Sequence, residues 1–132
     1  RGPARWFQPE AGDEIEKRLG EVVEGVAAAH GCRASVDYQR RYPATVNSAA
    51  EATLARRVGE TMGFDTSEAG PSMASEDFAF MLNAQRGAYI WLGAAREGDN
   101  PGLHSPYFNF NDDVLPRGAE FWVRLARQAL AV

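Results

Sequence analysis

His104 is the residue of this sequence best placed to do chemistry. It stands in Gly102-Leu103-His104-Ser105-Pro106, which follows an apolar run and its loop. Loops at strand ends are where α/β folds place ligands, and the neighbouring glycine and proline set the backbone conformation. A histidine there suits a metal ligand or a general base. The alternative is a histidine that only packs or caps a turn.

The sequence does not supply a complete metal site around His104. A catalytic zinc takes about three protein ligands and keeps an open position. The other candidate ligands are Glu76, Asp77, Asp112, Asp113 and Cys32. None of them stands in a short ligand motif such as H-E-x-x-H or C-x-x-C. If His104 binds a metal, we expect most of its partner ligands to lie elsewhere.

Two acidic segments have both a functional and a structural interpretation. Ser75-Glu76-Asp77-Phe78 puts two carboxylates at an expected helix start, where they line an active site or only cap the helix. Asn111-Asp112-Asp113 is interpreted mainly as a cap. Cys32 is expected to be a small core residue. Ser105 does not indicate a serine hydrolase, because no G-x-S-x-G elbow surrounds it.

Four helices are expected to position these residues. Apolar residues at three-four spacing predict the first helix, and Ser48 and Glu51 have the spacing of a capping box at the second. The last helix is apolar over a wide arc, so we expect it to be well buried. The expected helices are Asp13–His30, Ser48 to Gly63, a short one from Ser75, and one from Leu115.

Two strands with different patterns are also expected. Arg33–Tyr42 alternates apolar and polar residues, which predicts a half-exposed antiparallel strand. Gly87–Gly93 is apolar on both faces, which favours a central strand covered on both sides. The irregular stretch Ala94–Asp113 is long for a loop in a compact domain, and such loops are commonly functional or disordered.

Composition excludes several classes of protein. The 132 residues are 45% hydrophobic and 24% charged, as in an ordinary globular protein. The net charge of -4 does not favour a nucleic-acid binder, and one cysteine excludes an internal disulfide framework. No apolar run approaches the about 18 residues of a membrane span. We expect a soluble, cytoplasmic protein with no nucleic-acid or membrane partner.

A change of pattern near Tyr42–Asn47 divides the chain. Residues 1–46 hold a helix and an alternating strand, which predicts a two-layer α+β unit. Residues 47–132 hold a two-sided apolar strand between helices, which predicts an α/β layer. The first part is too short to hold a core alone, so both are expected to be parts of larger domains.

Several segments, taken in order, carry a family resemblance. Ser72–Phe78 resembles an acidic S/G-E-D-F block, and Gly87–Gly93 resembles the strand that follows it. Leu103–Pro106, Phe110–Asp113 and Gly118-Ala119 resemble a closing block. Together they resemble the dinuclear metal-dependent amidohydrolases, a family that includes hippurate hydrolase, indole-acetyl-amino-acid hydrolase and related aminoacylases and carboxypeptidases.

The resemblance extends to the start of the chain. Tyr42–Asn47 resembles the return from the lid domain of that family, and Gly2–Phe7 is a weaker match to a lid strand, with Pro3 in place of the usual threonine. The resemblance implies an α/β metallopeptidase-like catalytic domain with the end of a small α+β lid, or dimerisation, domain. Residues 1–46 would end the lid, and residues 47–132 would form the C-terminal part of the catalytic domain.

The resemblance also implies roles for three residues. His104 matches the last metal-binding histidine of the family. Arg5 matches a lid arginine that meets the substrate carboxylate, and Glu76 lies in a block near the active site, where we expect it to bind substrate. The implied reaction is hydrolysis of an N-acyl amino acid by water activated on two divalent ions, which would be zinc, manganese, nickel or cobalt.

Whole members of the family are longer, and this chain resembles only their C-terminal part. The remaining ligands and the general-base glutamate would lie in a missing N-terminal part, so we expect the chain alone to be inactive. Unpaired strand edges and apolar helix faces would then favour a homo-oligomer. One alternative is a non-catalytic oligomerising or binding module left from a truncated amidohydrolase. Another is a general α/β binding domain in which the motifs are coincidental.

Overall fold

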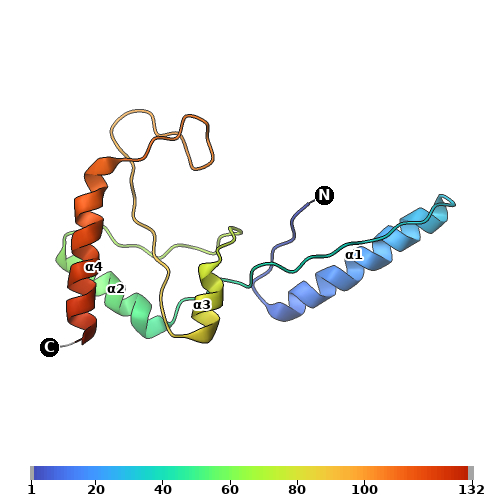
Figure 1. Ribbon diagram of the computed structural model, residues 1–132, viewed down its shortest axis with the longest axis horizontal. Coiled ribbons are helices and arrows are strands. Elements are labelled where there is room, and N and C mark those ends of the chain that lie inside the picture. The colour runs from blue at the N-terminus through green and yellow to red at the C-terminus, as the bar shows by residue number, and fades with distance from the viewer. Residues whose placement is uncertain (1, 131–132) are drawn as a thin grey trace. The chain divides into compact units, whose positions relative to one another are not determined.

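The structure, a computed structural model, describes residues 2–130 and contains four α-helices within them (Figure 1). The elements are α1 (Pro9–Ala29), α2 (Ala49–Thr61), α3 (Phe78–Ala84), the 3-10 helix η1 (Asp112–Val114) and α4 (Leu115–Leu130). The chain divides into two compact units. The first combines Arg1–Val46 with Ala69–Gln85, and the second combines Asn47–Glu68 with Arg86–Val132.

The four expected helices are all present. α1 begins at Pro9, earlier than the apolar spacing predicts, because proline at the first helical position has no N–H that needs a partner. Gly31 and Gly63 follow the ends of α1 and α2 with φ of 66° and 71°. This is the left-handed conformation that glycine adopts at helix C-termini, so the predicted helix stops are confirmed.

Ser48 is the N-cap of α2, but the predicted capping box does not form. The backbone N–H of Ser48 donates to the Gly87 carbonyl at 2.9 Å, and its Oγ accepts from the Gly87 N–H at 3.3 Å. Glu51 pairs with Arg86 at 3.1 Å instead of reaching back to Ser48. A contact with a distant segment has therefore replaced the local one.

The two segments expected as strands are extended but belong to no sheet among residues 2–130. A strand needs a neighbour for its ladder of hydrogen bonds, and no described segment forms such a backbone ladder with residues 33–46 or 87–96. Trp91 is 64% exposed, so the two covered faces expected for a central strand are not formed by this part of the chain. The helical structure leaves the α/β prediction unconfirmed.

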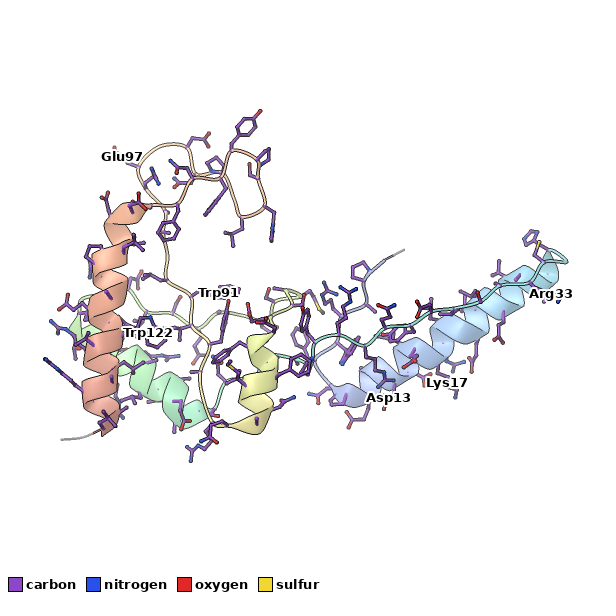
Figure 2. The ribbon with its side chains drawn as sticks, in the orientation of Figure 1. Asp13, Lys17, Arg33, Trp91, Glu97 and Trp122 are labelled. Carbon is purple, nitrogen blue, oxygen red and sulfur yellow. The ribbon has the colours of Figure 1, made fainter. Side chains whose placement is uncertain are left out.

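The first unit is held by aromatic contacts and a group of ion pairs. Trp6 packs on Gly12 of α1, and the extended residues 33–46 run back beside α1 (Figure 1). Arg40 on that segment pairs with Glu16 and, at 2.6 Å, with Asp13, which Figure 2 labels on α1. The hydrogen bonds that Arg40 donates to Glu16, and then to Asp13, raise the pKa of its guanidinium. Ion pairs with α1, rather than a backbone hydrogen-bond ladder with another strand, therefore hold residues 33–46 in the first unit.

The second unit has a small core between α2 and α4. Val58 is 1% exposed and lies in one cluster with Ala55 and Phe121, against which Phe64 packs at its edge. The Phe64 and Phe121 rings lie 6.4 Å apart. Arg117 of α4 lies 4.4 Å from the Phe64 ring centre, a cation–π contact that closes the cluster.

Two predicted burials are wrong. Cys32, expected in the core, is exposed because it lies just past the end of α1, where no described residue covers it. The last helix is not well buried: Trp122 and Leu130 of α4 are 58% and 73% exposed. Its wide apolar arc exceeds what α2 can cover within residues 2–130. No described helix is both long enough and apolar enough to cross a membrane.

Two glycines of α1 test the packing of Trp6. In Gly12→Ala the new Cβ would lie 2.7 Å from the indole, so we expect the free energy of unfolding to fall by about 1–3 kcal/mol. Gly25→Ala meets nothing within 4 Å and serves as the control. It should raise that free energy by up to about 1 kcal/mol, because alanine favours a helix. Urea denaturation followed by circular dichroism measures both, and equal effects would contradict the contact.

Candidate functional site

His104 lies at the third position of a tight turn. The Ser105 N–H donates to the Gly102 carbonyl at 3.1 Å, and His104 has φ of 68°. Among the described residues it is the one non-glycine residue with positive φ. These are the features of a type II turn, in which glycine is the preferred residue at this position.

A histidine in this conformation is strained, and such strain is concentrated at functional sites. The imidazole of His104 is exposed, so it is accessible to a metal ion or a substrate. Ser105 has a different task. Its Oγ accepts from the Tyr107 N–H at 3.2 Å and its carbonyl accepts from the Phe108 N–H at 3.1 Å. The serine therefore shapes the next turn.

The loop that carries His104 is closed at its base. The Nη2 of Arg96 donates to the carbonyls of Asn109 and Phe110 at 3.2 and 2.5 Å. Asn111, only 9% exposed, reaches the Ala95 carbonyl at 3.5 Å. In Figure 1 the loop folds back on itself beyond the N-terminal end of α4, and Figure 2 labels Glu97 on it.

Sequence reasoning missed the role of Arg96. The signal was weak, because one exposed arginine among many shows no pattern that would assign it two carbonyl partners far along the chain. The interpretation of Asn111 as a cap is confirmed, since its Oδ1 accepts from the Asp113 N–H at 3.2 Å at the start of η1.

Arg5 and the acidic block are brought together in the first unit. The Nε of Arg5 donates to the Met73 carbonyl at 3.1 Å, across 68 positions of sequence. Glu76 Oε1 accepts from the Phe78 N–H at 3.3 Å at the start of α3. This bond satisfies one N–H at the start of α3, although the N-cap residue itself, Asp77, makes no side-chain capping bond. Arg5 thus lies beside the segment that carries Glu76.

The candidate residues fall in both units, since Arg5 and Glu76 belong to the first and His104 to the second. No group of three or more His, Cys, Asp or Glu side chains that could hold a metal occurs among the described residues. The exposed imidazole on a strained turn fits one ligand of a metal site. The remaining ligands are not supplied by this part of the chain.

Comparison with known proteins gives a family. The sequence profile of peptidase family M20/M25/M40 matches residues 6–128. An IAA-amino acid hydrolase of Arabidopsis thaliana is 31% identical, over 98% of this chain and 31% of its own length. A putative amidohydrolase of Bacillus subtilis, YhaA, is 33% identical over 90% of this chain and 31% of its own length. The resemblance inferred from the motifs is therefore confirmed.

A solved structure agrees with the sequence match. The Bacillus subtilis YXEP protein, described as a dinuclear metal binding peptidase from the M20 family, superposes with a TM-score of 0.79 at 26% identity. The match covers 96% of this chain and 34% of that one. The metallopeptidase-like fold is thus shown, and the chain spans about a third of the length of the curated relatives it matches.

The strain at His104 can be measured by two substitutions. Both His104→Gly and His104→Ala remove the imidazole, but only glycine adopts positive φ without cost. We therefore expect the glycine variant to have the larger free energy of unfolding, by about 1 kcal/mol. At Lys17, exposed within α1, the same pair should give the opposite order. Urea denaturation measures all four, and an alanine variant at least as stable as the glycine one at position 104 would contradict the strained turn.

Proposed function

The chain belongs to peptidase family M20/M25/M40, and from that premise we propose that it is part of a metal-dependent amidohydrolase that cleaves the amide bond of N-acyl amino acids. The name of the Arabidopsis relative supports this substrate class, since it is an IAA-amino acid hydrolase. The neighbouring structure, a dinuclear metal binding peptidase, supports two divalent ions, for which zinc, manganese, nickel and cobalt are the candidates.

The observation that carries the proposal is His104 on its strained turn. It lies within the matched residues 6–128, and its exposed imidazole is held in a conformation that packing alone does not explain. A neutral imidazole nitrogen is a common metal ligand. His104 would contribute that nitrogen. Divalent ions held there would supply an activated water and polarise the amide carbonyl.

The first unit would bind the substrate. Arg5 carries a permanent positive charge, and a guanidinium suits a carboxylate because its donors match the two oxygens. The Met73 carbonyl holds one edge of Arg5 and orients it beside the acidic block. Glu76 would bind the substrate from that block, while its Oε1 also accepts from the Phe78 N–H at the start of α3. Both side chains would hold and orient the N-acyl amino acid.

The domain roles are part of the proposal. Residues 1–46 would end a lid domain, and residues 47–132 would form the C-terminal part of an α/β catalytic domain. The extended segments 33–46 and 87–96 would then pair with strands supplied from outside this chain. The exposed Trp122 and Leu130 support partners of this kind, or a second copy of the chain, because apolar patches associate.

Metal content tests the role of His104. In the complete enzyme, His104→Ala should lose bound metal on dialysis and lose activity, while its free energy of unfolding in the metal-free state changes little. His30→Ala is the control, since His30 is an exposed histidine at the end of α1. It should keep both metal and activity. Elemental analysis and turnover of an N-acyl amino acid measure these properties. An His104→Ala variant that keeps its metal and activity would refute the assignment.

The isolated 132-residue chain should not hydrolyse N-acyl amino acids. Its described residues offer no cluster of metal ligands, and a catalytic metal needs about three. Purified chain is incubated with hippurate and a divalent metal, and product is followed by chromatography. Turnover that is lost in His104→Ala would show that the chain is a complete enzyme and contradict this expectation. Turnover that persists in that variant would instead indicate a contaminating hydrolase.

A further inference from the structure

We propose that Arg96 is a positioning residue for His104, because its guanidinium clamps the base of the loop that carries the imidazole. The inference rests on the proposed function, in which His104 is a metal ligand. A ligand on an exposed loop is useful only if the loop is held in one place, since ordering it during binding would lower the affinity. Two side chains link the two halves of this loop, and Arg96 makes the shorter bonds.

The link joins residues far apart in the sequence. Nη2 of Arg96 donates to the Phe110 carbonyl at 2.5 Å and to the Asn109 carbonyl at 3.2 Å. These carbonyls lie 14 and 13 positions after Arg96, and His104 stands between. A charged donor forms stronger hydrogen bonds than a neutral one. The contact therefore closes a loop whose open form would have much more conformational freedom.

The other polar contacts of the loop do not close its base in the same way. Asn100 Oδ1 accepts from the Arg96 N–H at 2.8 Å, and its Nδ2 donates to the Arg96 carbonyl at 2.6 Å. These bonds shape the first turn of the loop but do not reach its far side. The bond from Asn111 to the Ala95 carbonyl is 3.5 Å long, at the limit for a hydrogen bond. Arg96 thus makes the strongest contact across the base.

One geometric detail predicts a rescue. Both bonds come from a single nitrogen, Nη2, so the forked shape of arginine is not needed. A lysine ammonium offers three donors on one nitrogen and should replace Arg96 in this role. Methionine is also unbranched but has no donor, so it should not. Arg57 is an exposed residue of α2 and provides the control for the same change, Arg57→Met.

The experiment uses the intact protein with Arg96→Met, Arg96→Lys and Arg57→Met. Hydrogen exchange of the metal-free protein reports closure of residues 97–108, with α2 as an internal reference. The 13C-edited NMR signal of the His104 ring reports its surroundings, and titration with Zn²⁺ reports affinity. In Arg96→Met we expect residues 97–108, but not α2, to lose protection from hydrogen exchange. The NMR signal of the His104 ring should shift, and the affinity for Zn²⁺ should fall by about 10–100-fold. Arg96→Lys should largely keep the loop protection, the His104 signal and the Zn²⁺ affinity of the unchanged protein. Arg57→Met should alter none of these three properties.

Each other outcome overturns a definite statement. Unchanged loop protection in Arg96→Met refutes the clamp, whatever His104 does. Lost protection with an unchanged His104 signal, or equal loss of protection in α2, would show a structural role only. If His104→Ala itself leaves Zn²⁺ affinity unchanged, the ligand assignment fails. In that case the exchange data and the His104 signal still decide whether Arg96 positions the loop.

Discussion

Val58 of α2 and Phe121 of α4 form the buried contact around which the second unit is arranged. Because this core has so few buried side chains, each contact at the edge of the core affects the position of the neighbouring segments. Arg117 donates to the carbonyl of Met62 at the end of α2, and a Cβ at Gly118 would lie 3.2 Å from Leu92. The loop of His104 therefore connects residues 87–96 to α4, and the contacts around the same small core hold both of these segments in place.

The loop itself is stabilised by polar contacts and carries the strain. Arg96 closes its base, Ser105 shapes its tip, and His104 has the unfavourable backbone conformation between them. A glycine at position 104 would relieve that strain, but it would remove the imidazole. Such a conflict between a favourable turn and a useful side chain is typical of functional sites. The residue found there is less stabilising than another residue at the same position would be.

The extended segments explain why the described residues look incomplete as a fold. Residues 33–46 and 87–96 have the strand-like patterns of the sequence, yet their backbone groups have no ladder within residues 2–130. Ion pairs of Arg40 hold one segment, and Ser48 holds the start of the other. The family relatives are about three times longer than the part matched here, as their 31% coverage shows. Pairing with the rest of such an enzyme would satisfy both segments.

The sequence by itself determined the elements whose causes are local. Apolar spacing and helix-start patterns located all four helices, and glycine marked the ends of two of them, because those signals act within a few residues. His104 was singled out from its flanking residues and from motif order, and that order also identified the family. Arg5 was chosen by resemblance alone, and its contact with Met73 was not foreseen. Glu76 was also singled out as an acid at an expected helix start, where it accepts from the Phe78 N–H.

The tertiary structure decided everything that depends on a distant partner. Ser48 has the sequence of a capping box but bonds to Gly87, and Cys32 has the character of a core residue but no described neighbour to cover it. The clamp of Arg96 and the strain of His104 exist only once the loop has closed. A local pattern cannot report such features, because side-chain hydrogen bonds and burial depend on which segments meet in space.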